Sequence, residues 1–335
     1  MTKLTDIGEF GFIARFASQF DGFIKKGELG IGDDCAVIPI NEKESYVVCT
    51  DLLTEGIHFL KDKITPQELG HKVLAVNLSD IAAMGAEPKY SFLSIGIPEN
   101  SSVSYMDAFI EGFYALSKKY GIPLMGGDTT KTADKLLINV MVIGQCKNSE
   151  LRLRSMAQEG DLICVTGSLG NSAGGLQVLL NELDQSSDTD FLIKKHHLPN
   201  PRIEEGCFLS KQASVGAMID ISDGISSDLL HILKASNKAA KVDIDALPIS
   251  NQLQKVAQKY QWDINDLATS GGEDYELLFT VRADDIERLK KEYLANFSEE
   301  ITIIGAVKGG EPNIAWYKDG EKIKLNKSGF NHFTK

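Results

Sequence analysis

The chain lacks several features that mark common classes of protein. No apolar run approaches the roughly 18 residues that span a bilayer, and the first residues lack the apolar core of a secretory signal. The net charge of −12 argues against the basic face that a nucleic-acid partner requires. We therefore expect a cytoplasmic protein with no membrane partner and no nucleic-acid partner.

The short-range cysteine and histidine patterns of metal centres are also missing. The five cysteines include no Cys-x-x-Cys pair, and the six histidines include no His-x-x-x-His or His-x-His pair. Because disulfides are rare in the cytosol, we expect reduced, structural thiols. The adjacent His196 and His197 precede Leu198 and Pro199 and are expected in a surface loop.

Two kinds of nucleotide-binding motif are absent. There is no Gly-x-x-x-x-Gly-Lys-Ser/Thr, which excludes a P-loop fold, and no His-Arg-Asp or Asp-Phe-Gly, which excludes the protein kinases. A glycine-rich passage at 166–175 joins an expected strand to an expected helix but lacks Gly-x-Gly-x-x-Gly. It fits a phosphate-binding loop and a tight structural turn about equally well.

The chain instead alternates short apolar runs rich in β-branched residues with longer helical patterns, which predicts α/β or α+β domains. The expected strands cover 36–40, 46–50, 91–97, 136–145, 162–166, 217–221, 275–281 and 301–307. The expected helices cover 66–84, 104–120, 172–183, 226–236 and 283–293. A length of 335 residues favours two domains. The polar segment 147–160 places their boundary, giving domains 1–148 and 149–335.

The most informative feature is a set of six motifs that put an acidic residue beside glycine, serine or threonine. Most follow an expected strand, and ligand sites of open sheets form at strand ends. Gathered carboxylates repel one another unless cations neutralise them, and hard oxygen ligands suit Mg²⁺. The motifs are Gly32-Asp33-Asp34, Thr50-Asp51, Asn77-Leu78-Ser79-Asp80, Gly126-Gly127-Asp128-Thr129, Asp220-Ile221-Ser222-Asp223-Gly224 and Gly271-Gly272-Glu273-Asp274.

Each motif taken singly leaves an ordinary structural explanation open. Asp80 falls on an apolar stripe of the helix expected at 66–84, where it binds a metal, caps a loop or pairs with a lysine. Asp223 caps a helix or binds a ligand, whereas Asp220 lies inside an apolar run and needs a partner. The motifs around Asp34 and Asp128 also fit plain turns, with glycines that let the backbone turn sharply or approach a ligand.

In their order and spacing, these motifs resemble the thiamine-monophosphate kinase family, within the aminoimidazole-ribotide-synthetase-like superfamily. The resemblance spans nearly the whole chain. It also includes Gly56-Ile57-His58-Phe59, Ile81-Ala82-Ala83-Met84-Gly85-Ala86, Arg154-Ser155, Gly160-Asp161, Val165-Thr166-Gly167 and Gly329-Phe330-Asn331-His332-Phe333.

The resemblance implies a two-domain fold in which the N-terminal domains of two subunits pair and ATP lies in a cleft without a P-loop. It implies thiamine monophosphate and ATP as substrates, with several Mg²⁺ ions around the triphosphate. The implied metal ligands are Asp34, Cys49 through its carbonyl, Thr50, Asp51, Asp80, Asp128, Asp220 and Asp223. The implied nucleotide contacts are Gly127, Asp128, Arg154 and Ser222, and the implied thiamine-phosphate contacts are His58, Glu273 and Phe330.

Three positions depart from the family pattern. Cys49 stands where serine is common, Met156 replaces a common glycine, and Phe330 stands where the type of aromatic residue varies. Two other kinds of protein stay possible at this point. One is an enzyme of the same fold that activates a carbonyl oxygen or makes selenophosphate, and the other is a non-catalytic protein that binds Mg²⁺ or nucleotide.

The expected reaction needs no general base. The second pKa of a phosphate ester is about 6, so the acceptor phosphate of thiamine monophosphate is ionised at neutral pH. We expect direct in-line transfer to this oxygen with no phosphoenzyme, and with the repulsion between two polyanions relieved by Mg²⁺ and Arg154.

Overall fold

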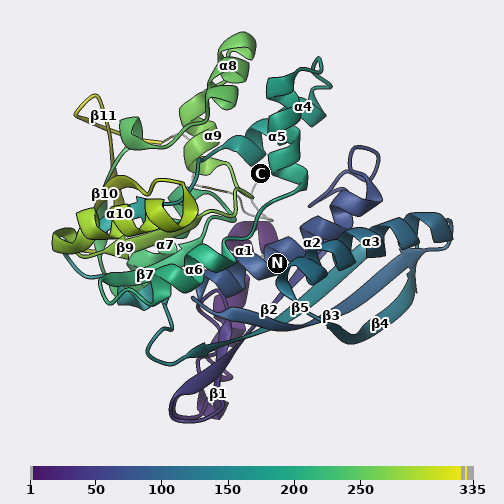
Figure 1. The fold of residues 1–335 in the computed structure, drawn as a ribbon, viewed down its shortest axis with the longest axis horizontal. Helices are drawn as coiled ribbons and strands as arrows, with labels where there is room; N and C mark the ends of the chain where they lie inside the picture. The colour runs from purple at the N-terminus through teal and green to yellow at the C-terminus, as the bar shows by residue number, and fades with distance from the viewer. Residues whose placement is uncertain (1–2, 326–328, 330–335) are drawn as a thin grey trace.

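The computed structural model describes residues 3–325 and 329, so the predicted contact Phe330 lies outside the described residues. The described chain forms ten α-helices and two β-sheets, and the helices α2 and α3 lie along one side of the first sheet (Figure 1). Among these residues no helix has both the length and the apolar character needed to cross a membrane. The expected mixed α/β class is therefore confirmed.

The first sheet has five strands in the order β1-β2-β5-β3-β4. Inward residues alternate with outward ones along β2 and β5, as the period of two of a strand requires. Val47 and Val140 point into the core, whereas Leu52 is exposed on the outward face. The strands are β1 (Ala36–Pro39), β2 (Glu44–Thr54), β3 (Glu87–Pro98), β4 (Leu124–Thr132) and β5 (Leu137–Lys147).

Two helices, α2 (Pro66–Ala83) and α3 (Val103–Tyr120), pack against each other and cover the inner face of this sheet. Thr65 starts α2 with a capping box to Glu68, and proline follows as the first helical residue. The helices approach closely because a Cβ on Gly70 would lie 1.9 Å from the carbonyl oxygen of Phe109. A larger residue at position 70 would therefore force α2 away from α3.

Helix α2 is buried on almost every side, which differs from the single apolar stripe expected from sequence. Of residues 69–86, only His71 and Asp80 keep partial exposure. The reason is that elements of both halves of the chain surround α2. The sheet strands β2 and β5 pack on one side, and α6 (Ile203–Ser210) and β7 (Val215–Asp220) pack on another.

The second sheet has seven strands in the order β12-β11-β8-β10-β6-β9-β7. Helix α7 (Ile225–Ser236) packs on one face, and α10 (Ile286–Phe297) packs on the other. Alternate residues of β9 enter these two cores, so every residue of β9 is buried. The remaining strands are β6 (Leu162–Val165), β8 (Ala239–Asp243), β9 (Leu277–Val281), β10 (Thr302–Lys308), β11 (Ile314–Lys318) and β12 (Glu321–Ile323).

The main hydrophobic core is continuous between the two sheets. It contains Val73 and Leu78 of α2 together with Leu209 of α6 and Phe279 of β9. The strands of the two sheets fall on either side of the predicted boundary at 148/149, which itself stays a prediction. The shared core indicates that the two halves pack directly against each other and are not separate domains joined by a flexible linker.

Two local predictions were wrong. The segment around Gly126 and Gly127, expected as a turn, is part of the edge strand β4, which pairs with β3 in parallel. His196 and His197, expected in a surface loop, end helix α5 and are each 4% exposed. The helix expected at 172–183 is α4 (Asn171–Leu180). Five further helices were not predicted: α1 (Leu4–Ala17), α5 (Ser187–His197), α6, α8 (Asn251–Tyr260) and α9 (Ile264–Ser270).

Candidate active site

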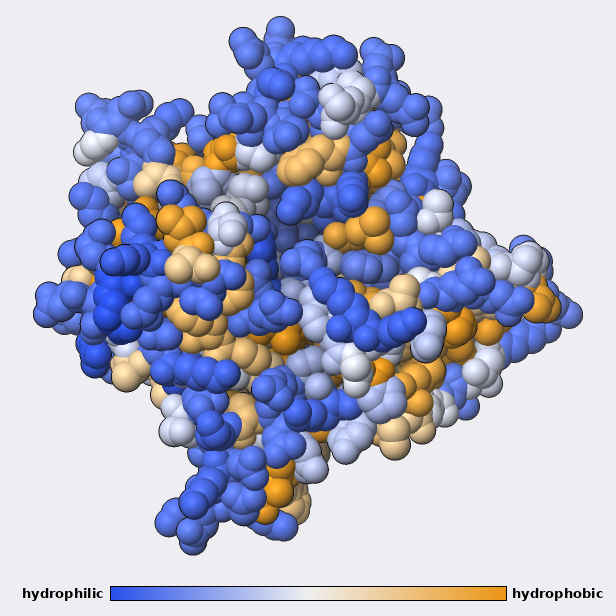
Figure 2. Space-filling view, in the orientation of Figure 1, coloured by the Kyte–Doolittle hydropathy of each residue, from blue (hydrophilic) through white to orange (hydrophobic). Residues whose placement is uncertain are grey.

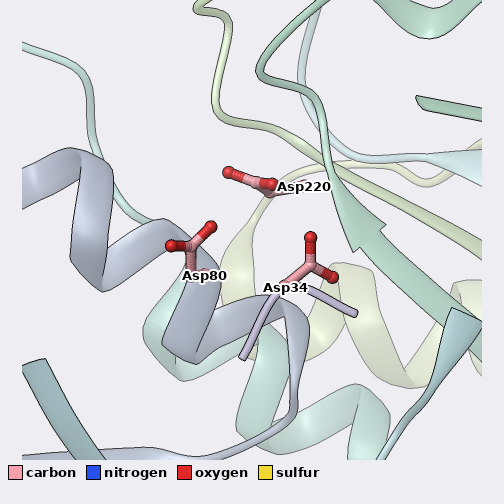
Figure 3. A group of neighbouring side chains, drawn as sticks. All are labelled: Asp34, Asp80 and Asp220. Atoms are coloured by element: carbon pink, nitrogen blue, oxygen red, sulfur yellow. The ribbon is translucent and has the colours of Figure 1, made fainter. Parts of the chain in front are cut away.

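Three carboxylates from distant parts of the sequence meet at the junction of the two halves. Asp34, Asp80 and Asp220 each offer an oxygen, and these oxygens all lie within 4.8 Å of one another. Figure 3 shows the three side chains directed toward a common space, with Asp80 on a helix and Asp34 on a separate segment opposite it. This convergence has the donor chemistry of a site for a hard divalent cation.

Two members of this trio lie on regular elements, and the third lies shortly before one. Asp34 lies just before β1, Asp80 lies in the last turn of α2, and Asp220 is the last residue of β7. The hydroxyl of Ser79 donates a hydrogen bond of 2.5 Å to Oδ2 of Asp220, which joins α2 to β7 at the site. Asp80 and Asp220 are therefore positioned by packed elements, and Asp34 is positioned by its hydrogen bond from Arg154.

Burial makes these carboxylates hard to ionise without a cation. Burial first, and then the charge of Asp34, raise the pKa of Asp220 to about 8. Burial and the neighbouring Asp51 raise the pKa of Asp80 well above its usual value. Burial also raises the pKa of Asp51 to about 6. A bound cation would favour the charged forms, so the site has an electrostatic demand for one.

Arg154 supplies part of that positive charge. Its guanidinium donates a hydrogen bond of 2.5 Å to Oδ1 of Asp34, and its backbone N–H donates to Oδ2 of Asp33 at 3.1 Å. The second oxygen of Asp34, Oδ2, is buried and has no hydrogen-bond partner. An orphaned carboxylate oxygen beside two further carboxylates fits a site for Mg²⁺.

The predicted ligands on β2 lie inside that strand, which continues to Thr54, so the expectation of a strand that ends at residue 50 was wrong. Thr50 donates its hydroxyl proton to the carbonyl of Val140, and the carbonyl of Asp51 accepts from Asn139 at 3.1 Å. The thiol of Cys49 points into the core and donates to the carbonyl of Asn77 at 3.3 Å. The thiol is therefore not available to a metal, and the role of the Cys49 carbonyl stays a prediction.

The predicted nucleotide contact Ser222 and the predicted metal ligand Asp223 form the turn between β7 and α7. The backbone N–H of Asp223 donates to the buried carboxylate of Asp228 at 3.2 Å. The carbonyl of Ser222 accepts from the backbone N–H of Glu273 at 2.8 Å. This turn is thus fastened both to α7 and to the loop that precedes β9.

Gly127 and Asp128 lie farther out, in the exposed edge strand β4. A Cβ on Gly127 would lie 1.7 Å from the carbonyl oxygen of Leu93, so the close approach that glycine permits is to β3. Asp128 pairs in register with Ser94 and is not part of the trio of carboxylates. Its predicted contacts with metal and nucleotide stay predictions.

The glycine-rich passage at 166–175 is held as a structural turn. The backbone N–H groups of Gly170 and Ser172 donate to the carboxylate of Asp274 at 2.6 and 3.1 Å. These amides at the start of α4 are the donors that a phosphate would use. Because Asp274 already occupies them, the structural explanation is the better one.

The predicted substrate contacts come from two loops. His58 follows β2, and its Nδ1 accepts a hydrogen bond from the backbone of Thr54 at 3.0 Å. Glu273 precedes β9, and its carboxylate lies 3.1 Å from the ammonium of Lys72. Figure 2 shows hydrophilic surface around a hollow near the centre of one face of the molecule.

Sequence reasoning missed several residues that support the site. Ser79 and Asp33 are each adjacent in sequence to a predicted metal ligand, and this adjacency could have indicated a role at the site. Lys72 stood as a charge inside the apolar run of α2, which could have indicated a buried pair. His196 and Asp228 carried no local signal, because their partners lie on other elements.

Comparison with known proteins defines the class in two parts that match the two sheets. Residues 32–146 match the model described as AIR synthase related protein, N-terminal domain, and residues 158–318 match its C-terminal counterpart. The chain is thus an AIR-synthase-related protein of two domains.

Full-length relatives narrow this class. The thiamine-monophosphate kinase of Salmonella typhimurium is 41% identical over 98% of both chains. A solved structure of AaThiL complexed with AMPPCP and TMP matches with a TM-score of 0.87 and 32% identity, over 99% of both chains. The structure of thiamine-monophosphate kinase from Stenotrophomonas maltophilia matches with a TM-score of 0.76 and 37% identity, over 94% of this chain and 98% of that one. The chain belongs to the thiamine-monophosphate kinase family.

Proposed function

We propose that the protein transfers the γ-phosphoryl group of ATP to thiamine monophosphate and so forms thiamine diphosphate. The observation that carries this proposal is the convergence of Asp34, Asp80 and Asp220, whose oxygens lie within 4.8 Å of one another. The family relatives named thiamine-monophosphate kinase, and the relative complexed with AMPPCP and TMP, support the choice of substrates.

We assign the site residues as the sequence predicted them. When bound, Mg²⁺ would neutralise the triphosphate and the developing charge on the transferred group. Its proposed ligands are Asp34, Cys49 through its carbonyl, Thr50, Asp51, Asp80, Asp128, Asp220 and Asp223. Gly127, Asp128, Arg154 and Ser222 are proposed to contact ATP, and His58, Glu273 and Phe330 are proposed to contact thiamine monophosphate.

The proposed mechanism is direct in-line transfer without a general base. The acceptor is a phosphate oxygen that is already ionised at neutral pH, because its second pKa is about 6. The protein's own task is to hold two anions in line and to exclude water from the transferred group. Arg154 contributes a fixed positive charge beside Asp34 at the site.

We also propose that two chains pair through the outward face of the first sheet. Leu52 on β2 and Met125 on β4 are 56% and 57% exposed on this sheet. Exposed apolar side chains on one sheet favour burial against a second copy. Leu52→Glu should shift the chain from dimer to monomer in sedimentation equilibrium, and an unchanged mass would contradict the pairing. The cytoplasmic location stays a prediction.

The decisive experiment supplies purified protein with ATP, Mg²⁺ and thiamine monophosphate. We expect thiamine diphosphate and ADP in equal amounts, and we expect Asp51→Asn and Asp223→Asn to abolish product while the fold persists. Failure of the wild-type protein to form product, together with ATP use on an aminoimidazole precursor, would assign it to the carbonyl-activating enzymes of this fold. Binding of Mg²⁺ or ATP without turnover on either substrate would indicate a non-catalytic protein.

A further inference from the structure

Lys72 is a charged residue with no exposed surface, near the middle of helix α2. A buried ammonium group is costly unless an opposite charge accompanies it. Its partner is Glu273, from the other half of the chain, whose carboxylate oxygens lie 3.1 and 3.2 Å from the lysine Nζ. The two oxygens of Glu273 are therefore both held by one cation.

The backbone of Glu273 is held as firmly as its side chain. Its φ angle is +63°, a left-handed value that residues with side chains seldom adopt. Its N–H donates to the carbonyl of Ser222 at 2.8 Å, and a Cβ on Gly272 would lie 2.3 Å from that same oxygen. Glu273 is thus locked to the turn that carries Asp223, with its carboxylate directed at α2.

His196 completes the surroundings of this carboxylate. Its Nδ1 lies 3.3 Å from Glu273 and 2.9 Å from the hydroxyl of Ser172. Burial, and then the charge of Lys72, lower the pKa of His196 well below its ordinary value, so the ring is neutral. The carboxylate therefore has one charged partner and one neutral partner, and a quarter of its side chain stays exposed.

Helix α2 links this arrangement to the cluster of carboxylates. Lys72 and Asp80 are eight residues apart on one helix, a rise of about 12 Å. One turn of α2 holds Asp220 through Ser79, and the turns before it hold Glu273 through Lys72. A buried helix is rigid, so it sets the separation between the two groups.

We propose that Lys72 is a positioning residue for thiamine monophosphate, which it serves by holding the Glu273 carboxylate at a set distance from the carboxylate cluster. His196 assists by packing beside one oxygen of that carboxylate, which lies 3.3 Å from its Nδ1. The proposal rests on the proposed function and deepens it, because it adds two residues to the binding of one substrate. It concerns the acceptor substrate, while ATP and Mg²⁺ are bound by other groups.

The test measures KM for each substrate in Lys72→Met, which keeps the apolar length of the side chain and removes the charge. We expect KM for thiamine monophosphate to rise about tenfold, while KM for ATP changes less than about twofold. Lys63→Met is the matched control, because Lys63 pairs with Glu182 at the exposed surface. It should leave both constants unchanged.

A double-mutant cycle with Glu273→Gln separates positioning from general damage. If Lys72 acts through Glu273, the double variant should lose little more affinity for thiamine monophosphate than Glu273→Gln alone. Additive losses, or equal rises in KM for both substrates, would overturn the proposal. A wild-type protein that forms no thiamine diphosphate would instead refute the proposed function and this inference with it.

His196 provides a second route if Lys72→Met does not fold. His196→Leu removes the Nδ1 contact, whereas His196→Asn keeps a donor near the same place. We expect a rise in KM for thiamine monophosphate in the leucine variant and its reversal in the asparagine variant. Equal KM values in wild type and His196→Leu, with both proteins folded and active, would contradict the assignment.

Discussion

Two clusters of carboxylates in this molecule differ in the cations that accompany them. Arg202 donates to Glu276 through Nε and Nη2 at 2.7 and 2.8 Å, and its Nη1 lies 2.9 Å from Glu205 and 2.8 Å from Glu299. The second cluster consists of Asp34, Asp80 and Asp220. Its neighbouring guanidinium, that of Arg154, donates a hydrogen bond to Asp34, whereas the guanidinium of Arg202 contacts every carboxylate of the first cluster.

This difference indicates that the Arg202 cluster stabilises the fold and that the Asp80 cluster binds a ligand. The Arg202 cluster joins α6 to β9 with its own positive charge, and Thr166 adds a hydrogen bond of 2.7 Å to Glu276. The Asp80 cluster has more negative charge than Arg154 neutralises, and burial raises the pKa of Asp220 to about 8. A cluster that is short of positive charge requires a ligand to supply it.

The largest effect is expected when a carboxylate of the binding cluster is removed. Asp80→Asn removes one carboxylate of the trio, and we expect formation of thiamine diphosphate to fall by a factor on the order of 10³. The loss follows from weaker neutralisation of the transferred phosphate. Steady-state assays at saturating ATP measure it, with the exposed Asp284→Asn as a control. Activity within tenfold of wild type would exclude Asp80 from the site.

The second prediction removes the cation of the Arg202 cluster, so that this cluster also lacks positive charge. Arg202→Met leaves Glu276 and Glu205 buried without their cation, and we expect unfolding free energy to fall by about 3–5 kcal/mol. Urea denaturation measures the change, and Arg282→Met is the control because Arg282 pairs with Asp285 at an exposed position. A loss below about 1 kcal/mol, typical of a surface pair, would refute the buried tie.

The third prediction supplies the charge that the binding cluster lacks. Mg²⁺ at a hundred times its dissociation constant should stabilise the protein by about 2.7 kcal/mol, if one site binds only the folded state. Thermal unfolding with and without a chelator measures the shift, with sodium chloride matched for ionic strength. Asp80→Asn should abolish most of the response, whereas Arg202→Met should keep it. An equal response in both variants would place the Mg²⁺ site elsewhere.

The smallest effect concerns His231, whose ring contacts that of Phe10 at a tilt of 54°. Burial, and then the charge of Arg154, lower the pKa of His231 to about 4. We expect Arg154→Gln to raise this pKa in part, since burial still lowers it, whereas Arg202→Met should leave it unchanged; NMR titration measures both. An unchanged titration of His231 in Arg154→Gln would show that Arg154 does not act on His231.

The same shift makes the stability of the protein depend on pH. A depressed histidine pKa favours folding above about 6.5, and this contribution is lost as pH falls toward 4. Arg154→Gln should therefore lessen the part of acid destabilisation that His231 contributes.

Much of the fold followed from local patterns. The apolar runs at 136–145 and 217–221 were predicted as strands and correspond to β5 and β7. Strand β4 was missed because Gly126 and Gly127 indicate a turn, and only the close approach of β3 makes glycine necessary there. His196 and His197 were placed at the surface because polar residues usually lie there, yet α5 packs them inside.

The sequence by itself determined the six acidic motifs, their order and the mixed α/β class, because these depend on residue type and on periods of two and 3.6. Only the tertiary structure decided that Asp34, Asp80 and Asp220 meet while Asp128 lies outside their trio. It also decided that Lys72 faces Glu273, 201 residues away in the chain. Such pairs depend on how α2 is enclosed by both halves, which no local pattern records.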